Sequence, residues 1–67
     1  MEHRIKELRT SLNWTQEQLS EKLGVSRQTI ISIENGRYNP SLELAYKIAK
    51  LFRLSIEDVF IFEKGSD

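Results

Sequence analysis

The chain contains no cysteine, and only one histidine and one proline among its 67 residues. Without cysteine it can form neither disulfides nor thiolate metal sites, so a chain this short depends on its hydrophobic core, with or without a subunit interface. The sole histidine, His3, stands near the N-terminus, where we expect an exposed side chain. Phosphate-binding loops, nucleophile elbows and metal-ligand spacings are also missing. The sequence therefore argues against an enzyme and predicts no metal or other cofactor.

Long apolar runs are lacking as well, and the first 12 residues are amphipathic and charged rather than leader-like. We therefore expect a cytoplasmic protein without a membrane segment. A chain of this length forms one domain, here residues 1–67. Its size is near the lower limit for folding without disulfides, bound metal or a subunit interface. It leaves no room for a second, sensing domain, so we expect no small-molecule ligand.

Net charge is also absent, because 10 basic residues balance 10 acidic ones. Bulk charge therefore does not predict nucleic-acid binding, but the distribution of charge is uneven. Residues 25–53 are mainly basic, whereas residues 54–67 are mainly acidic. Phosphates repel acidic side chains, so we expect the tail to face away from any bound DNA.

Apolar residues at helical spacing predict five helices, at about residues 2–12, 16–23, 27–35, 42–52 and 56–60. Thr15, Ser26, Ser41 and Ser55 are the expected N-caps, and Gln18 completes a capping box with the first of them. The fourth helix is the most apolar, so we expect it to be central. The sequence predicts a compact all-α domain followed by a short extended tail, residues 61–67.

The second and third of these helices are separated by a turn around Gly24. Glycine adopts the left-handed conformation that ends a helix, and Ser26 then begins the next one. Two short helices joined in this way form the helix-turn-helix pattern, whose second helix can lie in the major groove of DNA.

Residues 5–60 resemble the Cro/cI-type helix-turn-helix family, also called the XRE family, of prokaryotic and phage repressors. The resemblance rests on I-K-E-L-R, on W-T-Q-E-Q-L-S-E-K-L-G-V-S-R-Q-T-I-I-S-I-E-N-G-R-Y-N-P-S-L and on L-A-Y-K-I-A-K-L-F. The chain is also similar to the small cytolysin-operon repressor type through V-S-R-Q-T-I, Y-N-P-S-L and E-D-V-F. One departure is Ser20, where the family usually has a tightly packed alanine; serine is nearly as small, so we expect it to be tolerated.

The resemblance implies a lambda-repressor-like bundle that regulates transcription by binding double-stranded DNA. The simplest form is a homodimeric repressor that reads an inverted-repeat operator through the major groove. If Ile30 and Ile33 turn inward, the outer face and edge of the third helix carry the candidate base-reading residues Arg27, Gln28, Thr29, Ile31 and Ser32. Arginine can bond guanine with two hydrogen bonds and glutamine can do the same with adenine, whereas a solvated helix face is the plain alternative.

Phosphate contacts are expected on both sides of this face. The resemblance and the free N–H groups at helix starts indicate Gln16, Ser26, Asn35, Arg37, Tyr38 and Asn39. We also expect the amide of Gln16 to steady Gln28. The resemblance further pairs Arg9 with Glu34, which would neutralise a carboxylate that otherwise repels phosphate. The alternatives are an ordinary helix-opening glutamine and a merely structural loop.

The apolar run Phe60, Ile61 and Phe62 continues beyond the last helix and leaves two interpretations open. Either part of it folds back onto the core, or the tail forms a strand or apolar patch that pairs with a second subunit in a dimer. The main competing function is an antitoxin-like or other protein-interaction module that binds a partner protein. A stable homodimer that protects an inverted repeat would separate the repressor from this alternative.

Overall fold

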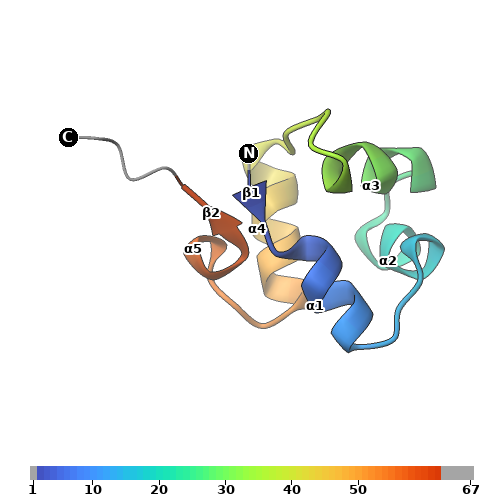
Figure 1. The fold of residues 1–67 in the computed structure, drawn as a ribbon, viewed down its shortest axis with the longest axis horizontal. Coiled ribbons are helices and arrows are strands. Elements are labelled where there is room, and N and C mark those ends of the chain that lie inside the picture. Colours follow the sequence, from blue (N-terminus) through green and yellow to red (C-terminus); the bar gives the residue numbers. More distant parts are fainter. Residues whose placement is uncertain (1, 63–67) are drawn as a thin grey trace.

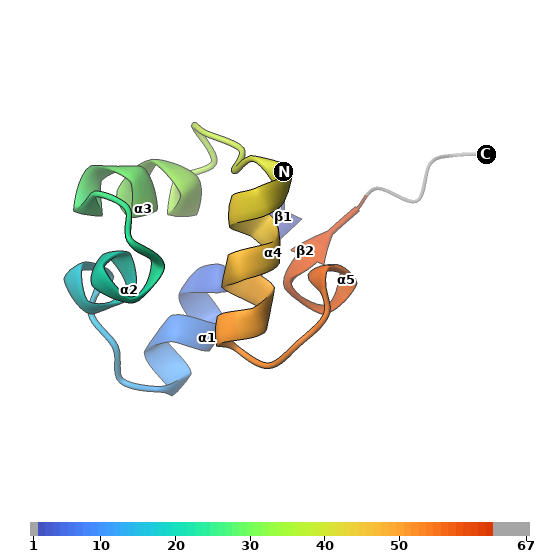
Figure 2. The ribbon, with the colours of Figure 1, turned by 180° about the vertical axis from the view of Figure 1, so that it is seen from behind.

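The computed structural model describes residues 2–62, which form five helices and a two-stranded antiparallel sheet (Figure 1). The elements in chain order are β1 (Glu2–His3), α1 (Ile5–Ser11), α2 (Gln16–Leu23), α3 (Arg27–Glu34), α4 (Leu42–Leu51), α5 (Ile56–Val59) and β2 (Phe60–Ile61). Helix α4 occupies the middle, with α2 and α3 on one side and α5 with the sheet on the other, as both views show (Figures 1 and 2). The five-helix architecture is therefore confirmed.

Side-chain caps start four of the helices. The hydroxyls of Thr15, Ser26, Ser41 and Ser55 each accept a hydrogen bond from the backbone N–H three residues later, and Gln18 completes the capping box at the first of them. The predicted caps are thus confirmed. Each satisfies an N–H group that the helix itself leaves without a partner, for about 1 kcal/mol of stability.

Left-handed residues end four helices. The glycine ends at Gly24 and Gly36 have φ angles of 74° and 77°, and Asn13 and Arg53 adopt the same conformation with φ angles of 61° and 60°. In each case the following N–H bonds to a carbonyl five residues earlier, the Schellman arrangement; Val25 to Ser20, at 3.0 Å, is one example. The turn of the helix-turn-helix is one of these four ends.

The core draws on every helix and on the second strand. Its fully buried large side chains are Ile5, Leu19, Ile30, Ile33, Ile48, Val59 and Phe60. Two of them, Ile30 and Ile33, belong to α3 and are directed inward as the spacing predicts. Because they fix the buried side of α3, they also determine which side of that helix faces solvent.

The N-terminal segment corrects one prediction. The first helix begins at Ile5 rather than at residue 2, because Glu2 and His3 form β1 and pair with Ile61 and Phe60 of β2. The N–H of Arg4, at the position before the helix, donates to the carbonyl of Val59 at 2.8 Å. Local periodicity placed these residues in a helix, but the ladder with the distant strand satisfies their backbone instead.

The end of the chain corrects a second prediction. Helix α5 stops at Val59, and Phe60 is 1% exposed within the core of its own chain, so its assignment to a dimer interface is wrong. Ile61 and Phe62 remain exposed. The predicted extended tail, residues 61–67, lies mostly beyond residue 62 and therefore outside the described residues. Among residues 2–62, no helix combines the length and the apolar character needed to cross a membrane.

Candidate nucleic-acid interface

Helix α3 lies at one side of the domain with one face against α2 and the other toward solvent (Figures 1 and 2). On the solvent side, Arg27 and Gln28 are exposed, while Thr29, Ile31 and Ser32 are partly exposed. All five proposed base-reading residues therefore have some solvent access. The buried isoleucines prevent the helix from turning this face inward, since that would expose Ile30 and Ile33 to water.

The polar groups on this face gather around a shallow depression of about 260 Å³. It is lined by Ser26, Gln28, Thr29, Ser32 and Tyr38. The amide nitrogen of Gln28 lies 3.5 Å from the hydroxyl of Ser32, at the long limit of a hydrogen bond. This long contact places the amide of Gln28 beside the hydroxyl of Ser32. Thr29 differs, because its hydroxyl contacts that of Ser26 at 2.9 Å and belongs to the cap.

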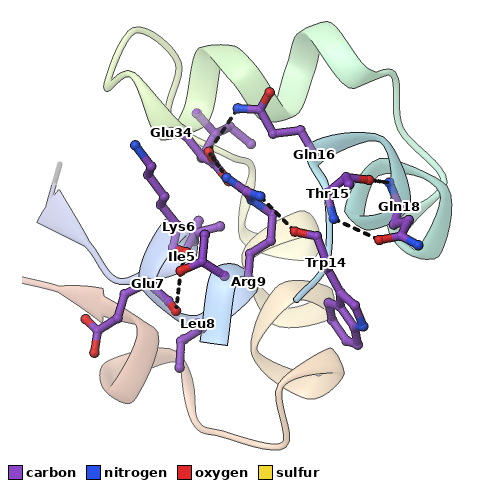
Figure 3. Close-up of polar contacts among 12 residues, drawn as sticks. Ile5, Lys6, Glu7, Leu8, Arg9, Trp14, Thr15, Gln16, Gln18 and Glu34 are labelled. Atoms are coloured by element: carbon purple, nitrogen blue, oxygen red, sulfur yellow. Dashed lines mark hydrogen bonds and ion pairs between the residues drawn. The ribbon is translucent and has the colours of Figure 1, made fainter. Parts of the chain in front are cut away.

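Arg9 and Glu34, which the resemblance pairs, are in contact at the C-terminal end of α3 (Figure 3). Arg9 donates from Nε to Oε2 of Glu34 at 2.8 Å, and from Nη2 to Oε1 at 3.2 Å. Its remaining Nη1 donates to the carbonyl of Trp14 at 2.8 Å. The two side chains are only 10% and 3% exposed, so α1, α3 and the connection before α2 are joined by a buried ionic cluster. The negative charge of Glu34 is compensated inside the protein.

Gln16 takes part in the same cluster and corrects a further expectation. Its amide nitrogen donates to Oε1 of Glu34 at 3.0 Å, rather than to Gln28. A carboxylate is a stronger acceptor than a neutral amide, which accounts for the choice of partner. The amide oxygen of Gln16 is turned away from Glu34 (Figure 3). Gln16 therefore ties the start of α2 to the end of α3.

Exposed polar residues flank α3 on both sides. The loop after it presents Asn35, Arg37, Tyr38 and Asn39 to solvent. Near its start, a second depression is lined by Thr15, Gln16, Glu17 and Arg27. The two flanks are where the backbones of a duplex would run if α3 entered the major groove, so their phosphate contacts stay a prediction of this geometry.

His3 is the residue of this region that sequence reasoning missed. It was expected to be exposed, but its ring is partly buried and its Nε2 lies 2.9 Å from the carbonyl oxygen of Ile33 in α3. The ring also meets Phe60 edge-on, with centroids 6.0 Å apart. A contact across 30 residues leaves no local signal, because it depends on the pairing of the two strands.

Comparison with known proteins points to one family. The helix-turn-helix family model matches residues 5–59. An uncharacterised helix-turn-helix transcriptional regulator from Methanocaldococcus jannaschii is 60% identical over 63 residues, covering 94% of this chain and 96% of that protein. Another, from Archaeoglobus fulgidus, is 56% identical over 64 residues, covering 96% of this chain and 90% of its own.

A solved structure gives the same result. The restriction-modification controller protein C.AhdI from Aeromonas hydrophila superposes with a TM-score of 0.75 at 31% identity, over 82% of this chain and 83% of that one. The exposed second helix of the motif, the match to the family and the full-length similarity to regulators agree. The chain belongs to the Cro/cI-type helix-turn-helix family of DNA-binding, non-enzymatic transcriptional regulators.

Proposed function

We propose that the chain is a homodimeric repressor that places α3 of each subunit in the major groove of an inverted-repeat operator. One observation supports this most strongly: α3 exposes Arg27, Gln28 and Ser32 while its own carboxylate, Glu34, is buried in an ion pair. A helix with this arrangement offers hydrogen-bonding groups to base edges without presenting a free negative charge to phosphate.

Gln28 and Arg27 are the proposed specificity determinants, with Ser32 and Ile31 beside them. A glutamine that bonds adenine, or an arginine that bonds guanine, discriminates by about 1 to 3 kcal/mol against the wrong base. Arg37, Tyr38 and the neighbouring asparagines, together with Gln16 and Ser26, contact phosphates and set the register. Because the net charge of the protein is zero, overall attraction to DNA contributes little to binding. Affinity then depends on these individual base and phosphate contacts.

The proposed dimer contact is an apolar groove between α4 and α5, occupied by a second copy of the chain. Its lining includes Tyr46, Lys50, Leu54, Ile56, Glu57 and Phe62. Helix α5, which lines one side of this groove, lies across the domain from α3 (Figure 2), so occupation of the groove leaves α3 of both subunits free. In a two-fold interface the same patch faces itself, which lets Lys50 of each copy approach Glu57 of the other. Phe62 is 53% exposed, an apolar area that such a contact would cover.

Repression follows from geometry. Two copies of α3 held about 34 Å apart reach successive major grooves on one face of the duplex and cover the intervening DNA. The similarity to the small cytolysin-operon repressor type fits this simple mode, in which a single domain, residues 1–67, acts in the cytoplasm without a bound effector.

The test is selection of bound sites from random duplex DNA, with the mass of the free protein measured by sedimentation. We expect recovered sites with two-fold symmetry and a spacing of one helical turn, and a dimeric mass. A monomer that recovers no preferred sequence would reject the repressor and favour the protein-interaction module.

A further inference from the structure

His3 connects the strand pair to the far end of the DNA-facing helix. Its backbone pairs with Phe60 in the ladder, and the N–H of the next residue, Arg4, bonds to Val59. From this fixed position the imidazole reaches the carbonyl of Ile33 at 2.9 Å. The last turn of α3 is therefore attached to the opposite side of the domain by one side chain.

Each ring nitrogen of His3 has a hydrogen-bonding partner. The N–H of Ile5 points to Nδ1 at 3.4 Å, a contact in which Nδ1 is the acceptor. In the neutral ring the proton is then on Nε2, which donates to the carbonyl of Ile33. Both ring nitrogens thus have a partner, and the ring cannot flip without losing both bonds.

The carbonyl of Ile33 is already an acceptor for the N–H of Gly36 at 3.0 Å, within the turn that ends α3. The imidazole supplies a second donor to the same oxygen. Since a carbonyl accepts two hydrogen bonds at separate lone pairs, the two donors together restrict how far this turn can shift or rotate. Arg9 of α1 donates a hydrogen bond to the next residue of α3, Glu34. Helix α3 otherwise packs mainly on α2, so these attachments fix its free end.

We propose that His3 is a positioning residue for base reading: it holds the last turn of α3 against the sheet so that Gln28 and Ser32 meet the bases in register. The inference rests on the proposed function of α3. Base recognition requires the side chains of α3 to be placed to within about 0.5 Å. One additional hydrogen bond at the end of the helix can determine whether that placement is reached. It also joins the reading helix to β2, the strand that precedes the proposed dimer residue Phe62.

Two substitutions separate positioning from packing. His3→Phe retains a ring against Phe60 but removes the donor to Ile33, whereas His3→Gln retains a donor at a similar reach. Glu2→Gln, in the same strand but with an exposed side chain, is the matched control. The measurement is the ratio of affinities for the selected operator and for a scrambled duplex, at a temperature where circular dichroism shows every variant folded.

We expect His3→Phe to lower this ratio about fivefold, the worth of one hydrogen bond, with unchanged affinity for the scrambled duplex. His3→Gln should recover most of the ratio, and Glu2→Gln should leave it unaltered. A ratio that His3→Phe does not change would overturn the inference alone. A wild-type protein without preference for any duplex would overturn the proposed function and this inference with it.

A measurement on the wild-type protein covers the case in which His3→Phe does not fold. Long-range proton–nitrogen correlation spectra identify which ring nitrogen carries the proton. We expect the proton on Nε2, with its signal shifting when the selected operator is added. A proton on Nδ1, or a signal that operator leaves unmoved, would overturn the inference.

Discussion

Arg9 and Glu34 are joined by two parallel hydrogen bonds, of 2.8 and 3.2 Å, although 25 residues separate them in the chain. The pair is nearly buried, and Gln16 and the Trp14 carbonyl complete its hydrogen bonding. It therefore keeps a carboxylate on α3, the helix that we propose faces DNA, without leaving that charge free.

Removal of one partner should be costly. Arg9→Ala leaves the carboxylate of Glu34 buried without its counter-charge, and we expect a loss of about 3 to 5 kcal/mol in the free energy of unfolding. Urea unfolding monitored by the fluorescence of Trp14, which stacks on Phe52, measures it. Glu7→Ala is the control, because the side chain of Glu7 takes part only in an exposed ion pair with Arg4, worth at most about 1 kcal/mol, among the contacts of the described residues. Equal effects of the two substitutions would contradict a structural role for the buried pair.

Ser20 should be dispensable. It is buried in α2, and its hydroxyl donates to the carbonyl of Glu17 at 2.7 Å, within the same helix. Alanine has the higher helix propensity and removes a competing side-chain bond, so Ser20→Ala should leave stability unchanged or raise it by about 0.5 kcal/mol. Ser20→Val, which adds volume at this buried position, should instead destabilise by about 1 to 3 kcal/mol. Thermal unfolding of both variants measures these changes in stability. A large loss of stability in Ser20→Ala would contradict the expectation that the hydroxyl is dispensable.

Gln28→Ala should relax sequence preference at one base position in each half-site. We expect a loss of about 1 to 3 kcal/mol in binding to the selected operator, and nearly unchanged binding to a scrambled duplex. Repeating the selection with the variant measures the preference directly. An identical selected sequence would show that Gln28 does not read a base.

Arg37→Ala should behave differently, because its proposed partner is a phosphate. Binding should weaken alike for operator and scrambled duplex, and the slope of log affinity against log salt should decrease by about 1. Lys22→Ala is a suitable control, since this lysine lies over the ring of Trp14 rather than on the flanks of α3. A sequence-dependent loss in the Arg37 variant would count against a phosphate contact.

Phe62→Asp should dissociate the dimer, because it places a charge in the proposed apolar interface. Sedimentation of the free protein should then show the mass of a monomer, and affinity for the full operator should fall toward that of a half-site. Leu42→Asp is the control, as Leu42 is exposed at the start of α4 and lies outside the groove. An unchanged mass would reject this interface.

The sequence predicted the parts of the fold that depend on neighbours in the chain. The caps at Thr15 and Ser26, the turn at Gly24 and the inward isoleucines of α3 follow from residues within one or two helical turns. The helix-turn-helix and its outer face could therefore be placed in advance. The Arg9–Glu34 contact was expected only because the resemblance pairs those positions.

The features that were missed depend on contacts between distant segments. β1 forms only because β2 lies beside it, and the burial of Phe60 follows from that pairing. The partner of Gln16 was wrong for a similar reason, since the choice between two acceptors depends on how α2 and α3 meet. His3 combines both difficulties: strand pairing puts it in place, and the end of α3 supplies its partner.

The pairing of β1 with β2 has a consequence for the order in which the domain folds. β1 precedes all five helices and β2 follows them, so the ladder joins segments that lie almost 60 residues apart in the chain. Such distant contacts cost more loop-closure entropy than local ones, so we expect the helix caps and turns to form before the ladder. The contacts of His3 and the burial of Phe60 then belong to the last step of folding, because both depend on the paired strands.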